Sequence, residues 1–368
     1  MSIDNISLQT KLLHNKHKFD PVTGGLSIPI QNASTFHQFN VDDFGTYDYA
    51  RSANPTRGAL EDILAEIEGG EAGFAFASGM AAISTTLLLL SAGDHIVITD
   101  DVYGGTYRVV TEVLVRLGIE YTFVDMTNLA QVQRVIKANT KAFYVETPSN
   151  PTLKITDIAA ISKLAKKHNA LTFVDNTFLT PLLQKPLNLG ADIVLHSATK
   201  FLAGHSDVVA GIAVVKDINL AKRLKFLQNT FGAVLGAHDA WLVMRGLKTL
   251  HIRLQASENS AKKIVEFLKK QPKINKVYYP DIGAVLSFEL ESYDAIKLFH
   301  KHVKIPAFAV SLGGVESILS YPAKMSHAAM TKSEREKRGI SDSLLRLSVG
   351  LEDVGDIIAD FEHALQKI

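Results

Sequence analysis

The chain contains 368 residues, 46% of them hydrophobic and 21% charged, which predicts a globular protein of about two domains. Its 39 basic and 38 acidic side chains leave a net charge of +1, which argues against a nucleic-acid or anionic-membrane partner. The absence of cysteine excludes disulfides, thiolate metal ligands and a cysteine nucleophile, and the 13 histidines show no metal-ligand spacing such as HExxH. The N-terminus lacks a signal-peptide pattern, and the longest apolar run, LLLL at 87–90, is too short for a membrane span. We therefore expect a cytoplasmic protein, without a bound metal, that acts on a small molecule.

The predicted elements divide the chain into three parts. Residues 1–45 mix polar residues, glycine and proline without a regular period, which predicts an extended N-terminal arm. In residues 46–237, amphipathic helices alternate with short apolar strands, the pattern of a mainly parallel sheet covered on both faces. We predict helices there at 58–70, 79–93, 106–118, 128–139 and 157–169, and strands at 95–101, 121–125, 141–147, 171–176, 191–198 and 211–215. A helical stretch is predicted at 218–270. Residues 238–368, which include the second part of this stretch, are predicted to form a smaller α+β domain, with strands at 284–290, 308–314 and 344–350 and helices at 292–302 and 353–368.

Chemically useful residues follow several of these strands, and ligands of α/β sheets bind where the strands end. Asp175, Asn150 and Lys200 each lie at or just after the end of a predicted strand. A helix begins at the tripeptide Ser-Gly-Met at 78–80, where free backbone N–H groups favour a phosphate. Pyridoxal phosphate satisfies all of these features: its phosphate suits the helix start, its ring nitrogen needs a carboxylate, and its aldehyde forms a Schiff base with a lysine.

Seven motifs in order carry a family resemblance: YDYARSANPTR, DDVYGGTYR, ETPSNPTL, VDNTFLTPLLQKPLNLGADIVLHSATK, SATKFLAGHSD, SLGGVES and LLRLSVGLED. Together they resemble the Cys/Met-metabolism family of pyridoxal-phosphate enzymes, which includes cystathionine γ-lyase, cystathionine β-lyase, cystathionine γ-synthase and methionine γ-lyase. The resemblance covers residues 20–368. It implies the fold-type I, aminotransferase-like architecture and makes 46–237 the pyridoxal-phosphate-binding large domain. It also implies a homotetramer of two active dimers, with sites shared across the dimer interface.

The resemblance implies a role for each residue of the cofactor site. Lys200 forms the Schiff base and then abstracts the substrate α-proton, Asp175 keeps the ring nitrogen protonated, and Tyr103 stacks on the ring and assists proton transfer. Tyr49 and Arg51 reach the phosphate of the neighbouring subunit. The full set expected to bind the cofactor is Lys200, Ser78, Gly79, Met80, Tyr103, Asn150, Asp175, Thr177, Ser197, Thr199, Tyr49 and Arg51.

The resemblance also implies how a substrate binds. Arg346 is expected to bind the substrate α-carboxylate together with Ser311 and Asn150, although an internal salt bridge is a simpler explanation for a charge in an apolar strand. Asp48 and Arg108 are expected to bind the distal end of cystathionine, which favours cystathionine over methionine as the substrate.

The preferred activity is that of cystathionine γ-lyase, which releases cysteine, 2-oxobutyrate and ammonia, with side activity on cysteine or homocysteine. Cystathionine β-lyase, and then cystathionine γ-synthase or a relative that uses O-acetylhomoserine, stay open as alternatives. Val310 counts against strict γ specificity, because animal γ-lyases carry an acidic residue at this position.

Proteins of other classes fit the sequence less well. A nucleotide-binding oxidoreductase would need a GxGxxG or GxxxxGK loop, and neither occurs. A regulatory protein would need a recognition domain, for which the arm is too short.

One connection departs from the family pattern. Only Asp281, Ile282 and Gly283 separate KVYYP from AVLSFEL, where relatives carry a longer loop rich in His, Gln and Gly. A true deletion would leave a tight hairpin. The favoured interpretation is that loop residues are missing between 280 and 284.

Overall fold

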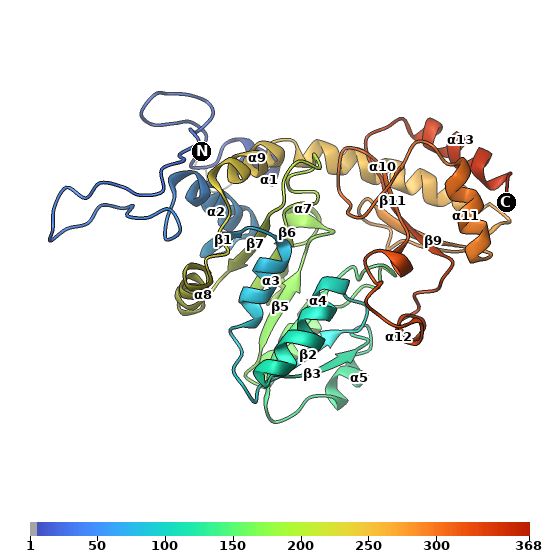
Figure 1. The fold of residues 1–368 in the computed structure, drawn as a ribbon, viewed down its shortest axis with the longest axis horizontal. Coiled ribbons are helices and arrows are strands. Elements are labelled where there is room, and N and C mark those ends of the chain that lie inside the picture. Colours follow the sequence, from blue (N-terminus) through green and yellow to red (C-terminus); the bar gives the residue numbers. More distant parts are fainter. Residues whose placement is uncertain (1–5) are drawn as a thin grey trace.

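A computed structural model describes residues 6–368, and within this range the strands form one sheet of seven strands and one of five (Figure 1). The large sheet has the order β1-β7-β6-β5-β4-β2-β3. Its strands are β1 (Ala72–Phe76), β2 (His95–Thr99), β3 (Glu120–Val124), β4 (Thr140–Glu146), β5 (Leu171–Asp175), β6 (Ile193–Ser197) and β7 (Gly211–Val215). β3, β2, β4, β5 and β6 are parallel to one another, whereas β7 is antiparallel to both β6 and β1. The predicted α/β class with a mainly parallel sheet is confirmed.

Helices cover both faces of the large sheet, which explains why its inner strands are continuously apolar and buried. One face packs against α3 (Gly79–Leu87), the helical segment 104–117 and α8 (Ile218–Phe231). The other face packs against α2 (Pro55–Glu68), α5 (Leu129–Arg134), α6 (Ile158–Lys167) and α9 (Ala237–Leu247). The segment 104–117, predicted as one α-helix, consists of α4 (Gly104–Arg108), a π-helix (Val109–Leu114) and a 3₁₀ turn (Val115–Leu117). Two short helices, α7 (Thr180–Leu183) and a 3₁₀ turn (Pro186–Leu189), connect β5 to β6.

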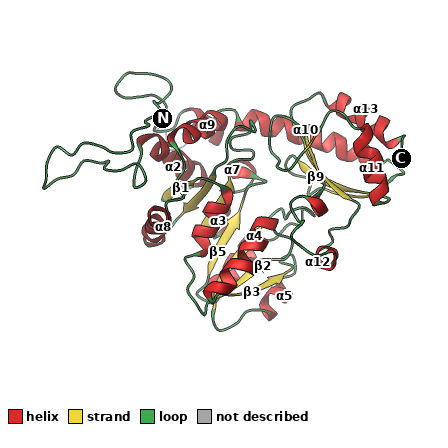
Figure 2. Cartoon of the chain, in the orientation of Figure 1, coloured by secondary structure: helices red, strands yellow, loops and turns green. Residues whose placement is uncertain are grey.

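The second sheet has the order β10-β11-β12-β9-β8 and lies beside the large sheet (Figure 2). Its strands are β8 (Ile274–Tyr278), β9 (Val285–Leu290), β10 (Ala307–Phe308), β11 (Ile318–Ser320) and β12 (Leu344–Ser348), and α10 (Leu250–Leu268), α11 (Tyr293–His302) and α13 (Val354–Leu365) pack on it. A 3₁₀ turn (Pro322–Lys324) and α12 (Lys332–Lys337) precede β12. The predicted strand at 308–314 is wrong beyond Phe308, because Ser311 and Gly313 have positive φ angles that interrupt an extended chain. The predicted domain boundaries at 45/46 and 237/238 stay predictions.

Two further segments bear on the sequence analysis. The arm contains a short helix, α1 (Leu8–Leu13), which begins at Ser7 and buries Leu12 against the core. The connection 279–284 forms a tight hairpin between the antiparallel strands β8 and β9, with Asp281 and Gly283 at positive φ. This is the geometry expected for so short a connection, and the interpretation that loop residues are missing stays a prediction. Within residues 6–368, no helix is both long and apolar enough to cross a membrane.

Candidate active site

A cavity of about 490 Å³ lies at the carboxyl ends of β4, β5 and β6, between the large sheet and the C-terminal sheet. Parallel strands bring their carboxyl ends to one edge, so residues distant in sequence meet there. Thirteen of the predicted site residues line the cavity: Ser78, Gly79, Met80, Tyr103, Arg108, Asn150, Asp175, Thr177, Ser197, Thr199, Lys200, Ser311 and Arg346. The sequence therefore identified most of the side chains that surround this cavity.

Lys200 lies in the turn that follows β6, and its Nζ donates a hydrogen bond to Ser311 Oγ at 2.6 Å. Burial, with a smaller contribution from the nearby charge of Arg346, lowers the pKa of the Lys200 amine to about 8. Near neutral pH a tenth or so of this amine is therefore unprotonated, far more than for an exposed lysine. Such an amine can attack an aldehyde or accept a proton.

Asp175 ends β5, and its carboxyl group is almost fully buried. Its Oδ1 accepts hydrogen bonds from Thr177 N at 3.0 Å and Thr177 Oγ1 at 2.5 Å, and its Oδ2 accepts one from Tyr144 Oη at 3.3 Å. Burial raises the pKa of Asp175, while these hydrogen bonds favour the ionised carboxylate and oppose that effect. A carboxyl group in this position is a suitable partner for a buried cationic nitrogen.

The start of α3 provides a place for an anion. Ser78 is the N-cap and its side chain accepts a hydrogen bond from Ala81 N at 3.0 Å. A Cβ on Gly79 would lie 2.9 Å from Ser197 Cβ, so glycine lets β6 approach the helix start closely. The hydroxyl of Thr199 already bonds with the backbone of Ala210. The helix N-terminus and the residues beside it therefore form a narrow, preformed cradle suited to a phosphate.

Arg346 extends from β12 into the cavity and is 3% exposed. Its guanidinium donates to Asn150 Oδ1 at 2.9 Å, to Ser311 O at 2.7 Å and to Ser320 Oγ at 3.2 Å, while its Nε has no partner. Burial lowers the pKa of Arg346 to about 10, so it stays charged at neutral pH. Among the described residues it forms no salt bridge, contrary to the simpler explanation, and a buried cation of this kind is suited to a carboxylate ligand.

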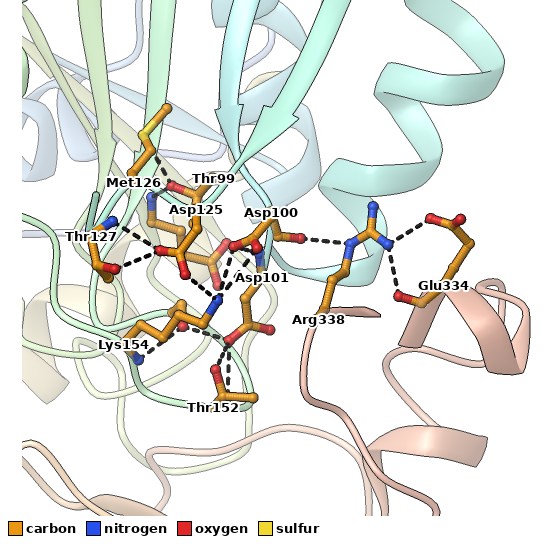
Figure 3. Close-up of polar contacts among 12 residues, drawn as sticks. Thr99, Asp100, Asp101, Asp125, Met126, Thr127, Thr152, Lys154, Glu334 and Arg338 are labelled. Carbon is orange, nitrogen blue, oxygen red and sulfur yellow. Dashed lines mark hydrogen bonds and ion pairs between the residues drawn. The ribbon is translucent and has the colours of Figure 1, made fainter. Parts of the chain in front are cut away.

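Tyr103 belongs to a loop, residues 100–104, that polar contacts fix at several points (Figure 3). Tyr103 N donates to Glu146 Oε2 at 2.9 Å, and Asp101 Oδ2 accepts hydrogen bonds from Ser149 and Thr152. A Cβ on Gly104 would lie 1.8 Å from a backbone oxygen, that of Ser326, so this loop is in close contact with residues 325–327. Tyr103, 38% exposed, therefore stands at the cavity on a constrained backbone.

Some cavity residues were missed in the sequence analysis. Glu146, buried at the end of β4, lines the cavity, and burial, with the charge of Asp175, raises its pKa well above the usual value. Its place at a strand end, as for Asp175, was a signal that could have identified it. Met325 and Ser326 also line the cavity, but they follow no strand and belong to no pattern that would mark them.

Three predicted residues do not line the cavity of their own chain: Asp48, Tyr49 and Arg51. They follow the N-terminal arm in the chain and precede α2, and Figure 1 shows the arm projecting from the body of the molecule. Arg51 donates to Asn229 O at 2.6 Å, and Tyr49 is 47% exposed. Their expected roles therefore stay predictions.

The cavity residues fit pyridoxal phosphate. Lys200 offers an amine to the aldehyde, Asp175 offers a carboxylate to the ring nitrogen, and the close approach at Gly79 shapes a phosphate cradle. When bound, the cofactor supplies an electron sink for a carbanion at the substrate Cα.

Comparison with known proteins gives a consistent result. A model of the Cys/Met metabolism PLP-dependent enzyme family matches residues 9–366. The chain belongs to this family. Among curated relatives, the cystathionine beta-lyase MetC of Bacillus subtilis (strain 168) is 61% identical, with 100% of this chain and 98% of the relative covered. The cystathionine gamma-lyase of the same organism is 48% identical, with 98% and 99% covered.

A solved member of the family, cystathionine gamma-lyase from Lactobacillus plantarum complexed with L-serine, superposes with a TM-score of 0.96 at 45% identity, covering 99% of both chains. The fold-type I architecture, the pyridoxal-phosphate cofactor and the class of carbon–sulfur lyase are thereby confirmed. The alignment with the Bacillus subtilis beta-lyase spans 384 positions, against 368 residues in this chain, so about 16 positions have no counterpart here.

Proposed function

We propose that this protein is a cystathionine β-lyase, which converts cystathionine and water into homocysteine, pyruvate and ammonia. The observation that carries the proposal is the comparison within one organism: the Bacillus subtilis beta-lyase is 61% identical, and the gamma-lyase of that organism 48%. This reverses the order favoured by the sequence analysis, which placed γ-elimination first. Val310, which is 64% exposed beside Ser311, fits the reversal because it offers no acidic group at the cavity entrance.

γ-Elimination from cystathionine is the second candidate. It is supported by the gamma-lyase of Lactobacillus plantarum, whose structure superposes on almost the whole chain. The residues around the cavity suit both reactions, since each begins with removal of the α-proton. The two candidates differ in the carbon that loses sulfur, Cβ or Cγ.

The following roles belong to the proposal. Arg346 and Asn150 bind the substrate α-carboxylate, with Arg346 Nε as a free donor. The amine of Lys200, whose pKa of about 8 leaves an appreciable neutral fraction, accepts the α-proton. Tyr103 donates a proton to the departing sulfur from the cavity wall, and Arg108 faces the distal part of the substrate.

The oxo-acid released from L,L-cystathionine distinguishes the candidates. The purified holoenzyme is expected to release pyruvate and homocysteine in equal amounts, with 2-oxobutyrate below a tenth of the pyruvate. Chromatography of the derivatised oxo-acids measures both products directly, and Lys200→Ala serves as the control for non-enzymatic release. Predominant 2-oxobutyrate would instead establish the γ-lyase and refute the proposal.

We further propose that the active form is a homotetramer of two active dimers, in which Asp48, Tyr49 and Arg51 enter the neighbouring subunit's cavity. The proposal is supported by two observations: these residues do not line the cavity of their own chain, and the arm exposes apolar side chains, Phe39 at 90% and Val41 at 86%. Apolar groups exposed to this extent on an arm favour burial against another chain. Sedimentation or mass photometry measures the assembly. The cytoplasmic location stays a prediction.

Sharing of sites is tested by mixing two inactive variants, Arg51→Ala and Lys200→Ala. A hybrid dimer contains one site with both intact residues, so the mixture is expected to recover up to about a quarter of wild-type activity from random pairing. The absence of recovery after verified subunit exchange would show that each site is built from one chain.

A further inference from the structure

The carboxyl group of Asp175 has different partners on its two oxygens. Both donors of Thr177 bond to Oδ1, at 3.0 and 2.5 Å. The partner of Oδ2 is the hydroxyl of Tyr144 at 3.3 Å. Asp175 lines the cavity, whereas Tyr144 does not and is 0% exposed. The oxygen bonded to Tyr144 thus has fewer protein donors than Oδ1 and can accept a further proton donor from a ligand.

The sheet brings Tyr144 and Asp175 to the same face. Tyr144 is opposite Phe173, and Glu146 is opposite Asp175, in the parallel pairing of β4 with β5. Because alternate residues of a strand point to the same face, Tyr144 and Glu146 lie on one side of β4, as Phe173 and Asp175 do on β5. The tyrosine therefore reaches the carboxylate from within the core, beneath the cavity.

Asp175 needs this donor because its surroundings favour the neutral acid. Burial raises its pKa, and the hydrogen bonds from Thr177 and Tyr144 oppose this effect. A ring nitrogen that must stay protonated needs an ionised carboxylate, and hydrogen bonds donated to the carboxylate stabilise that form. Burial and the charge of Asp175 raise the pKa of Tyr144 well above its usual value, so the phenol keeps its proton and acts as a donor.

We propose that Tyr144 is a positioning residue for the cofactor, which acts through Asp175 by holding Oδ2 ionised and directed at the ring nitrogen of pyridoxal phosphate. The inference rests on the proposed role of Asp175 as partner of that nitrogen. It adds a residue that contacts neither cofactor nor substrate.

The test compares the affinity of the apoenzyme for two cofactor forms. Tyr144→Phe removes one hydroxyl and keeps the ring, and it is expected to bind pyridoxal 5′-phosphate about tenfold more weakly than wild type, the size expected for one hydrogen bond to a charged group. The probe 1-deazapyridoxal 5′-phosphate replaces the ring nitrogen with C–H. Tyr144→Phe and wild type are expected to bind this analogue with equal affinity, because the interaction with Asp175 is absent in both.

Three further variants complete the experiment. Tyr121→Phe, on β3, removes a hydroxyl away from the cavity and is the matched control, with no expected change. Placing p-aminophenylalanine at position 144 retains an N–H donor and should restore the affinity for pyridoxal 5′-phosphate. If Tyr144→Phe does not fold, this variant is compared with wild type in its place. Asp175→Ala should weaken pyridoxal-phosphate binding more than Tyr144→Phe does.

Each result has a distinct meaning. Unchanged affinity in Tyr144→Phe together with weak binding in Asp175→Ala would overturn the inference on Tyr144 and leave the role of Asp175 standing. Unchanged affinity in both variants would overturn the role of Asp175 itself. An equal loss for both cofactor forms in Tyr144→Phe would show a merely structural effect and would also refute the inference.

Discussion

The buried amine of Lys200 should cost the apoprotein stability, and its removal should therefore stabilise the fold. Burial lowers the pKa of Lys200 from about 10.5 to about 8, a shift equivalent to about 3 kcal/mol at neutral pH. Lys200→Met keeps the side-chain length without the charge. It loses the hydrogen bond to Ser311, which contributes about 1 kcal/mol. The net expectation is an apoprotein more stable than wild type by about 2 kcal/mol at pH 7.

The pH dependence follows from the direction of the shift. Well below pH 8 the amine is protonated in both states, so the folded state carries the full cost of the buried charge. Between pH 8 and about 10.5 the folded protein releases this proton while the unfolded chain keeps it, so wild-type stability rises relative to the variant. The advantage of Lys200→Met should thus be complete well below pH 8 and disappear above about 10.5.

Denaturant unfolding of the two apoproteins at pH 7 and pH 10 measures this difference, with the cofactor removed because binding would stabilise wild type alone. Lys163→Met, an exposed lysine on α6, is the matched control and should change stability by less than about 0.5 kcal/mol. A variant no more stable than wild type at pH 7, or an advantage that does not depend on pH, would refute the reasoning.

Three other substitutions test the site and its support. Arg346→Lys should lower kcat/KM for cystathionine about 100-fold, because a single ammonium group cannot replace a guanidinium that also donates a hydrogen bond to Asn150. Steady-state kinetics measures kcat/KM, and a loss below about threefold would contradict this prediction. Gly104→Ala should destabilise the protein by more than about 3 kcal/mol, because its Cβ would lie 1.8 Å from Ser326 O. Gly58→Ala, where nothing lies close to the added Cβ within α2, should instead stabilise it by about 0.5 kcal/mol. Thermal unfolding compares the two variants, and equal effects would count against the close approach at Gly104. Arg338→Met removes the hydrogen bond to Asp100 O in the loop that carries Tyr103, and should lower kcat at least fivefold with unchanged affinity of the apoenzyme for pyridoxal phosphate. An unchanged kcat would show that Arg338 does not support Tyr103.

Local sequence patterns were sufficient to predict six of the seven strands of the large sheet, all except β1, and most of the cavity. Short apolar runs identified the inner strands, and the parallel arrangement then required their polar ends to converge, as Asp175 and Lys200 do. The family motifs added Tyr103 and Arg346, which no hydrophobic period distinguishes. In the second sheet, the same patterns failed near Ser311, because a positive φ at a residue other than glycine leaves no mark in the sequence.

Contacts between distant segments could not be predicted in this way. Arg338 Nε donates to Asp100 O at 2.8 Å (Figure 3), although 238 residues separate them. The guanidinium also lies 5.5 Å from the centre of the Tyr107 ring. Neither residue shows a periodicity that indicates its partner. Tyr144 is a similar case: alone it is an aromatic residue of a strand, and its significance comes from the register that places it beside Asp175.

The loop at 100–104 shows how the two sheets jointly define the site. Asp100 contacts Lys154 and Arg338, Val102 O accepts a hydrogen bond from buried His327 at 3.3 Å, and Tyr103 N bonds to Glu146. Burial lowers the pKa of His327 to about 4, so this contact stays neutral and unchanged across the working pH range of the protein. Arg338 and His327 both lie between β11 and β12, on the side of the C-terminal sheet. The backbone that carries Tyr103 is therefore bonded to both parts of the chain, and a shift of the C-terminal sheet would move Tyr103 relative to Lys200.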